Sequence, residues 1–143
     1  DHRQIGPLAV CRPARAPHAP YRPNPRDPHR PGSAKLVELP TATVPLSRVP
    51  FTGRLAVSLP RRAVAAAYRA LRMRDFVAVE LHGWDLLDES DGASAALVER
   101  RRDLRVPVAA KRQRISELVD WLKHDFELLT LEEAAERLAP ALR

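Results

Sequence analysis

The chain has 143 residues, a length typical of one domain with a modest hydrophobic core, and its single cysteine, Cys11, excludes an internal disulfide framework and is typical of a reducing compartment. The net charge of +6 comes mostly from arginine and by itself gives little reason to expect nucleic-acid binding. No apolar run approaches the roughly 20 residues that a membrane-spanning helix needs, and no signal-peptide pattern follows Asp1. We therefore expect no membrane span and a cytoplasmic location, with any export signal lying upstream of Asp1.

Residues 1–34 are predicted to form an irregular, extended segment rich in proline and arginine. Twelve of the fourteen prolines lie within the first 60 residues. Because proline fixes φ and lacks a backbone donor, residues 12–31 are incompatible with a helix or a central strand, and turns are expected near Asn24-Pro25 and Pro31-Gly32. Two interpretations stay open: a flexible linker, or a long loop pinned over a groove by Tyr21 and several arginines.

Three short apolar runs in the middle of the chain are predicted strands, namely residues 35–39, 55–59 and 76–81. An irregular connection rich in proline and glycine separates the first two. Residues 76–81 are interrupted only by Glu80 and are expected to be buried on both faces. Between residues 60 and 75, apolar residues recur at helical spacing opposite a row of arginines, which predicts an amphipathic helix.

The remainder of the chain continues this alternation. A polar loop through residues 90–92 leads to a short apolar patch at 95–98, and Pro107 precedes a second amphipathic helix whose apolar stripe has Trp121 at its margin. Residues 126–129 are a candidate last strand. Thr130 and Glu133 then form a capping box that begins the final helix. Strands alternating with helices predict a parallel α/β architecture over residues 35–143.

His82 is the leading candidate functional residue. It directly follows the predicted strand 76–81, and Gly83 allows the chain to turn there. The carboxyl ends of parallel strands are where α/β proteins place their chemistry. A structural role, as a hydrogen-bonding cap of the strand, is the alternative. The carboxylates after it (Asp85, Asp88, Glu89 and Asp91) do not have calcium-loop spacing, and we interpret them as a solvated loop.

No metal site is predicted within this chain, because its five histidines are scattered and no two have the i, i+4 spacing of a helical metal pair. The chain also lacks a glycine-rich phosphate loop and a nucleophile elbow. Cys11 has no base placed beside it and is interpreted as an ordinary cysteine. His124 lies at a helix end, where a cation suits the helix dipole and no further role is needed.

Several segments together resemble a known family. The run from Glu80 to Asp88 (ELHGWDLLD), followed by Asp103 to Pro107 (DLRVP) and Lys111, resembles the C-terminal section of polysaccharide deacetylases of the NodB-homology type. Residues 126–134 (FELLTLEEA) are similar to the last strand and helix of that family. Residues 19–23 (APYRP) and 37–40 (VELP) are similar to segments that cross its later strands. The resemblance extends over residues 20–138.

The resemblance implies a distorted (β/α) barrel that hydrolyses N-acyl groups from a carbohydrate substrate. In such enzymes an aspartate and two histidines hold a divalent metal, commonly zinc, and a second aspartate is the base for the metal-bound water. The histidine of the Leu-His motif protonates the departing amine. Carried over to this chain, His82 would be that acid and Leu81 would line the pocket for the acyl methyl group. Tyr21 and Trp84, which lie in matching segments, are added as candidate substrate-binding residues.

The chain also departs from the family. The metal-binding motifs of these enzymes, a paired-aspartate strand end and a His-x-x-x-His helix, do not occur here. Arg12 and Arg15 lie near prolines and only faintly match the Arg-Pro motif that orients the base. We therefore interpret the chain as the C-terminal portion of a deacetylase-like barrel (residues 35–143) after the Pro/Arg-rich segment, and we expect it to be inactive in isolation. Neither its sugar nor its oligomeric state is predicted.

A second hypothesis assigns the chain no catalytic role. Arg22, Arg26, Arg30 and Tyr21 combine positive charge with one stacking ring, which would suit an anionic partner such as RNA or an acidic glycan. The small number of aromatic residues and the absence of an RNA-binding motif make nucleic acid the less favoured partner. Binding of this kind should weaken steeply with salt and should survive His82→Ala.

Overall fold

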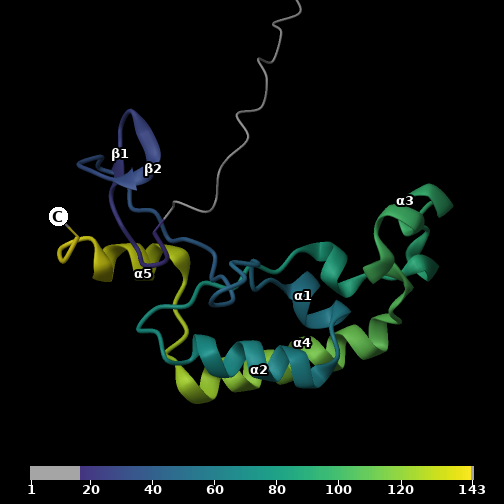
Figure 1. Ribbon diagram of the computed structural model, residues 1–143. Coiled ribbons are helices and arrows are strands. Elements are labelled where there is room, and N and C mark those ends of the chain that lie inside the picture. The colour runs from purple at the N-terminus through teal and green to yellow at the C-terminus, as the bar shows by residue number, and fades with distance from the viewer. Residues whose placement is uncertain (1–16, 143) are drawn as a thin grey trace, which may run out of the picture.

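The computed structural model describes residues 17–142 and shows a mixed α/β protein that is mostly helical (Figure 1). The predictions for Cys11, Arg12 and Arg15 lie outside these residues. The α-helices are α1 (Gly53–Ser58), α2 (Arg61–Leu71), α3 (Ala95–Arg100), α4 (Val108–Asp125) and α5 (Leu131–Leu138). Strands β1 (Pro23–Asn24) and β2 (Asp27–Pro31) pair antiparallel, and the 3-10 helices are η2 (Gly83–Leu86), η3 (Glu89–Asp91) and η4 (Arg102–Arg105).

The proline-rich segment forms the hairpin β1–β2, which turns at residues 25 and 26, so the turn predicted near Asn24-Pro25 is confirmed. The absence of a helix and of a central strand from residues 17–31 is confirmed as well. Arg22 joins this hairpin to the chain after α5: its Nε donates to the carbonyl oxygen of Leu142 (3.1 Å) and its Nη2 to that of Ala139 (3.1 Å). The hairpin accordingly lies beside α5 (Figure 1).

Helices α2, α4 and α5 confirm the three helices predicted from apolar periodicity. The capping box of α5 is present, with the Glu133 amide donating to Thr130 Oγ1 (3.2 Å) and the Thr130 amide donating to Glu133 Oε2 (2.8 Å). Trp121 is partly buried against the core, at the margin of the stripe as predicted. These predictions were correct because long amphipathic patterns and caps are local properties of the sequence.

The predicted strand at residues 55–59 is wrong, because these residues lie in and just after α1. The buried residues of α1 are Gly53, Ala56 and Val57, which have helical rather than alternating spacing, and Leu59 is left 39% exposed. Residues 35–39 form only one bridge, between Glu38 and Tyr21, and residues 126–129 form no strand. The predicted parallel α/β alternation is therefore not observed in the described residues.

The segment 76–81 is extended, yet it is not the strand buried on both faces that its sequence predicts. Its pairing consists of two isolated parallel bridges, Thr41 with Ala78 and Thr52 with Glu80. Val77 and Val79 pack against the core, whereas Leu81 is 48% exposed. Residues 76–79 are each partly buried, so neither side of the segment is fully covered, and the chain reaches the surface at residues 80–82.

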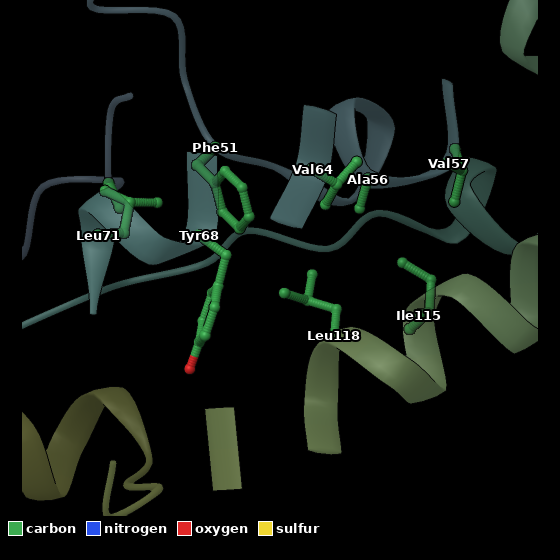
Figure 2. Packing of buried hydrophobic residues seen from close by; sticks show 9 residues of the cluster. Phe51, Ala56, Val57, Val64, Tyr68, Leu71, Ile115 and Leu118 are labelled. Atoms are coloured by element: carbon green, nitrogen blue, oxygen red, sulfur yellow. The ribbon is translucent and has the colours of Figure 1, made fainter. Parts of the chain in front are cut away.

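One apolar core holds α1, α2 and α4 together (Figure 2). Its buried members are Ala42, Phe51, Ala56, Val57, Val64, Tyr68, Leu71, Ile115 and Leu118. Figure 2 shows the side chains of α1 and α2 pointing toward Ile115 and Leu118 of α4. Among residues 17–142, no helix has the length and apolar character needed to cross a membrane.

Candidate functional site

His82 is the N-cap of η2 and begins a tight turn at the end of the extended segment. Its backbone N–H donates to Asp85 Oδ2 (2.9 Å), and its carbonyl accepts from the Asp85 N–H (2.9 Å). The imidazole is about half exposed, and Nε2 lies 3.4 Å from Glu80 Oε1. The backbone of His82 is thus fixed, while its half-exposed ring lies beside the Glu80 carboxylate.

Leu81 and Trp84 lie close to His82 in sequence and are both exposed, by 48% and 43%. The Arg101 guanidinium lies over the Trp84 ring, 5.4 Å from its centroid, and restricts that ring. Tyr21 lies elsewhere. It belongs to the hairpin side of the molecule, it is 7% exposed, and its hydroxyl donates to the Pro28 carbonyl (2.7 Å). Leu81, His82 and Trp84 therefore share one exposed stretch of the chain, whereas Tyr21 belongs to the hairpin.

The side chain of Asp85 stabilises the turn by a hydrogen bond to the His82 backbone. Its side chain is 1% exposed, and Oδ2 accepts the His82 amide, whereas Oδ1 has no hydrogen-bond partner within the described residues. Gly53 at the start of α1 directly adjoins this carboxylate: a Cβ at residue 53 would overlap Asp85 Oδ2. The Gly53 amide in turn donates to the Glu80 carbonyl (2.9 Å). Helix α1 and the His82 turn are therefore in direct contact.

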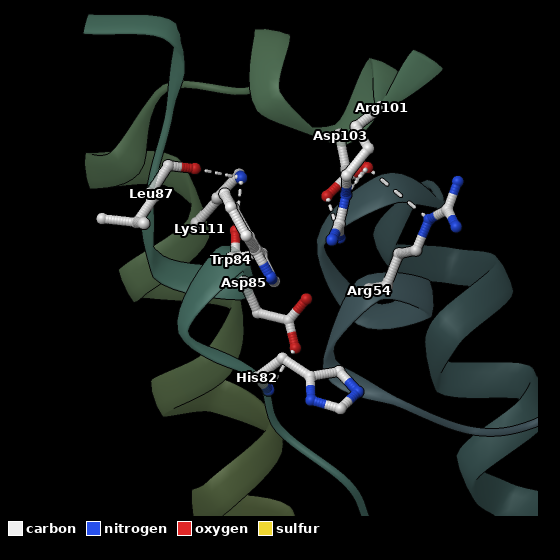
Figure 3. Close-up of polar contacts among 8 residues, drawn as sticks. All are labelled: Arg54, His82, Trp84, Asp85, Leu87, Arg101, Asp103 and Lys111. Atoms are coloured by element: carbon white, nitrogen blue, oxygen red, sulfur yellow. Dashed lines mark hydrogen bonds and ion pairs between the residues drawn. The ribbon is translucent and has the colours of Figure 1, made fainter. Parts of the chain in front are cut away.

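Lys111 of α4 is fully buried on the other side of this turn. Its ammonium donates to the carbonyl oxygens of Trp84 (3.1 Å) and Leu87 (Figure 3). Burial lowers the pKa of Lys111, and the nearby carboxylates of Asp103, Asp85 and Asp88 oppose that effect. Sequence reasoning gave Lys111 no structural role, although it lies four residues before Ile115 on the apolar stripe of α4, a position where a buried lysine needs partners.

Asp88 joins η3 to α4 through hydrogen bonds to backbone amides of both. Its Oδ1 accepts from the Ser90 amide (2.9 Å) and its Oδ2 from the Val108 amide (2.6 Å), which caps the first turn of α4. The hydrogen bonds from Ser90, followed by that from Val108, lower the pKa of Asp88. The interpretation of these carboxylates as a solvated loop is therefore wrong for Asp85 and Asp88, which are buried and accept backbone amides.

Asp103 is the third buried carboxylate. Arg101 Nη2 lies 2.8 Å from its Oδ2, and Arg54 Nε lies 3.5 Å from its Oδ1. Burial raises the pKa of Asp103, but the hydrogen bond and charge of Arg101 outweigh this effect and lower the pKa below its ordinary value. Buried carboxylates and cationic side chains therefore lie next to one another around the turn. The ion pair between Asp103 of η4 and Arg54 of α1 joins these two helices beside it.

The described residues do not contain the metal ligands that the family resemblance implies. Within residues 17–142, no three His, Cys, Asp or Glu side chains are grouped so as to hold a metal ion. Asp88 accepts backbone amides through both oxygens and Asp103 is paired with arginines, whereas Asp85 accepts a single amide through Oδ2. We therefore assign no chemical step at this site to a metal.

Comparison with known proteins gives no matching family model, no matching curated protein and no matching solved structure. What this site can do must therefore be judged from its own geometry. It presents one exposed imidazole with an adjacent carboxylate and two exposed apolar side chains, all carried by a turn that buried polar groups hold in place. Such an arrangement suits proton transfer to a ligand bound at the surface.

Proposed function

We propose that this chain is the C-terminal part of a metal-dependent polysaccharide deacetylase and that His82 is its general acid. The observation that carries the proposal is the presentation of His82: its backbone is hydrogen-bonded to a buried aspartate, while its ring is about half exposed. A general acid needs this combination of a fixed backbone and an accessible proton. The sequence resemblance supplies the reaction class.

The role of each residue follows from the reaction. Hydrolysis of an N-acyl group adds water to the carbonyl carbon and breaks the C–N bond, and the departing nitrogen takes a proton. Protonated His82 would give that proton, and Glu80 would pair with the imidazolium before the transfer. Leu81 and Trp84 offer apolar surface for the acyl methyl group and the sugar ring. The base and the metal would come from residues other than those described.

The barrel ancestry is part of the same proposal. The feature in its favour is the pair of parallel bridges that Ala78 and Glu80 form with Thr41 and Thr52. Parallel pairing between segments distant in sequence is typical of a βαβ arrangement, in which a helix such as α2 connects neighbouring strands. A barrel section separated from its remaining strands would keep only such short pairing.

The first experiment asks whether the isolated chain is active. The purified 143-residue chain, incubated with N-acetylated chito-oligosaccharide and Zn²⁺, should release no acetate above the rate without protein, because no metal ligand set is formed by its described residues. Release of acetate that depends on both Zn²⁺ and the chain would contradict the proposal that this chain supplies the general acid but neither the metal site nor the base.

The second experiment tests His82 itself. The DNA upstream of the Asp1 codon is read in frame for a paired-aspartate strand end and a His-x-x-x-His helix, and the extended enzyme is then purified. His82→Asn should lower kcat by roughly 10²–10⁴-fold, the usual contribution of a general acid, with little change in KM. His29→Asn, in the hairpin, is the matched control and should leave both constants unchanged. Equal kcat values for the two variants would exclude the proposed role.

The non-catalytic alternative is also a proposal, and the described contacts give it less support. The ring of Tyr21 is buried, Arg22 donates to backbone carbonyls, and Arg30 pairs with Asp27 (3.1 Å), so these side chains already have partners. The two functions separate by experiment. Binding of an anionic polymer that falls steeply with salt and survives His82→Ala would favour the basic module.

A further inference from the structure

A groove of about 270 Å³ lies between α2 and α4, away from the His82 turn. It is lined by Arg61, Ala65, Tyr68, Arg69, Arg72, Trp121, His124 and Asp125. The two helices run side by side in the same direction (Figure 1). Arg61 at the start of α2 pairs with Glu117 in the middle of α4, and Tyr68, farther along α2, reaches Asp125 at the end of α4. The groove therefore has a ring-lined floor and ends where both helices end.

The floor of the groove is apolar and already ordered. The rings of Tyr68 and Trp121 lie 5.3 Å apart at an interplanar angle of 38°. The Tyr68 hydroxyl lies 2.7 Å from the Trp121 carbonyl oxygen and 2.9 Å from Asp125 Oδ2, so the polar group of this buried tyrosine is satisfied. Figure 2 shows the Tyr68 side chain extending from α2, with its hydroxyl directed away from Phe51. The aromatic side chains that line the groove are therefore held in place before any ligand binds.

The walls of the groove carry cations without partners. Arg69 and Arg72 are exposed, and neither side chain has a hydrogen bond or an ion pair to any residue within 17–142. Arg61, in contrast, pairs with Glu117 and lies over the Trp121 ring, 5.8 Å from its centroid. The one carboxylate of the lining, Asp125, is occupied by Tyr68. Two unpaired guanidinium groups beside an aromatic floor favour an anion that also has a flat or apolar ring.

We propose that this groove binds a small ring-bearing carboxylate, with the ring against Trp121 and the carboxylate held by Arg69 and Arg72. Guanidinium groups bind carboxylates through paired hydrogen bonds. The negative ends of two helix dipoles and Asp125 lie at the same end of the groove, which disfavours a doubly charged phosphate relative to a singly charged carboxylate. Its volume is just below the roughly 300 Å³ at which ligand pockets for drug-sized molecules begin, so it fits one ring.

Two classes of compound carry both a ring and a carboxylate, aromatic acids and acidic sugars, and the test includes one of each. Benzoate and glucuronate are titrated separately into the ¹⁵N-labelled chain. Trp121 and Trp84 are the only tryptophans, so their two indole N–H signals, assigned with Trp84→Phe, give a reporter in the groove and an internal control outside it. At least one of the two acids should shift the Trp121 signal and leave that of Trp84 in place. The acid that does so identifies the class of compound.

Matched variants and simpler anions complete the experiment. Arg69→Gln with Arg72→Gln should raise the Kd of the bound acid by about tenfold, the loss expected for a charge-assisted contact. Arg62→Gln, an exposed change on α2 outside the groove, should leave the Kd within about twofold. Acetate, which has no ring, and inorganic phosphate should bind more weakly. The proposal is overturned if neither ring acid shifts Trp121, if acetate or phosphate binds as tightly, or if the double variant binds like the Arg62 variant. Because His82 lies outside the groove, these outcomes are independent of the deacetylase proposal.

Discussion

Lys111 shows how one buried residue fixes the position of a functional turn. Its ammonium is enclosed between α4 and η2, where it donates to the backbone carbonyl oxygens of Trp84 and Leu87. Three carboxylates lie near enough to oppose the fall in its pKa. A buried cation of this kind adds little stability relative to an apolar core, but its removal takes a donor from both carbonyls and leaves the nearby carboxylates without its charge.

We predict that Lys111→Met lowers the free energy of unfolding by about 3 kcal/mol. Methionine fills a similar volume, so the loss reflects the unsatisfied polar groups rather than a cavity. Urea denaturation followed by circular dichroism measures the change. Lys123→Met, at an exposed position on the same helix, should change stability by less than about 0.5 kcal/mol. Similar stabilities for the two variants would show that the buried ammonium is dispensable.

At the scale of elements, the contact between α1 and η2 depends on the absence of one side chain. An added Cβ at Gly53 would overlap the Asp85 carboxylate and lie 2.8 Å from Leu81 Cδ2, closer than carbon atoms approach in practice. Nothing lies within 4 Å of a Cβ added at Gly83. The two glycines therefore have different reasons to be present: the first permits close packing, and the second adjoins open space.

This contrast gives a paired prediction. Gly53→Ala should destabilise the fold by about 2 kcal/mol through overpacking and should shift the backbone amide signal of His82, whose partner Asp85 is displaced. Gly83→Ala should leave the stability unchanged to within about 0.5 kcal/mol. Urea denaturation and amide spectra measure both effects. A Gly53→Ala variant as stable as Gly83→Ala would mean that α1 does not rest against the turn.

The same region shows how far the sequence predicts the structure. The helices α2, α4 and α5 were predictable because each carries a repeated apolar pattern or a cap within its own residues. Residues 55–59 were not, since five apolar-rich residues fit either a strand or a helix, and only the packing of Ala56 and Val57 against the core decides. The local sequence pattern thus determines the secondary structure of the long helices, whereas tertiary contacts determine that of short segments such as 55–59.

Within the candidate site, the sequence indicated His82, Leu81 and Trp84 but not what supports them. Asp85 and Asp88 lie in a run of polar residues that is typical of an exposed loop, and no local pattern shows that α1 and α4 cover them. The partner that joins Asp88 to α4 is distant in sequence, because Val108 lies twenty residues after Asp88. Tyr21 also looked available for a ligand, because its partner Pro28 is recognisable only once the hairpin is formed.

At the scale of the whole molecule, Arg22 connects the two ends of the described chain. Its guanidinium donates to the carbonyls of Ala139 and Leu142 on one side, and to that of Lys35 (3.0 Å) on the other. The apolar core lies elsewhere, among α1, α2 and α4. The hairpin is therefore attached to α5 by polar contacts and can open without unfolding the core.

We predict that Arg22→Gln raises the hydrogen-exchange rates of the Gly32 and Ala34 amides, which pair within the hairpin region, by about tenfold. Amides of α4 should exchange at unchanged rates. Arg26→Gln, at the exposed tip of the hairpin, is the control and should exchange like the parent chain. Equal protection of Gly32 and Ala34 in both variants would show that the hairpin is held by other contacts.

The contacts of Arg22 also bear on which sequences this fold tolerates. Every partner of its guanidinium is a main-chain carbonyl oxygen, a group that each of the twenty amino acids carries. These hydrogen bonds therefore depend on the path of the backbone and not on which side chains it carries. Substitutions from 139 to 142 are compatible with an intact hairpin as long as the chain follows the same course, whereas an insertion or deletion there would move the acceptors out of reach. Over residues 139–142, length is therefore constrained more tightly than composition.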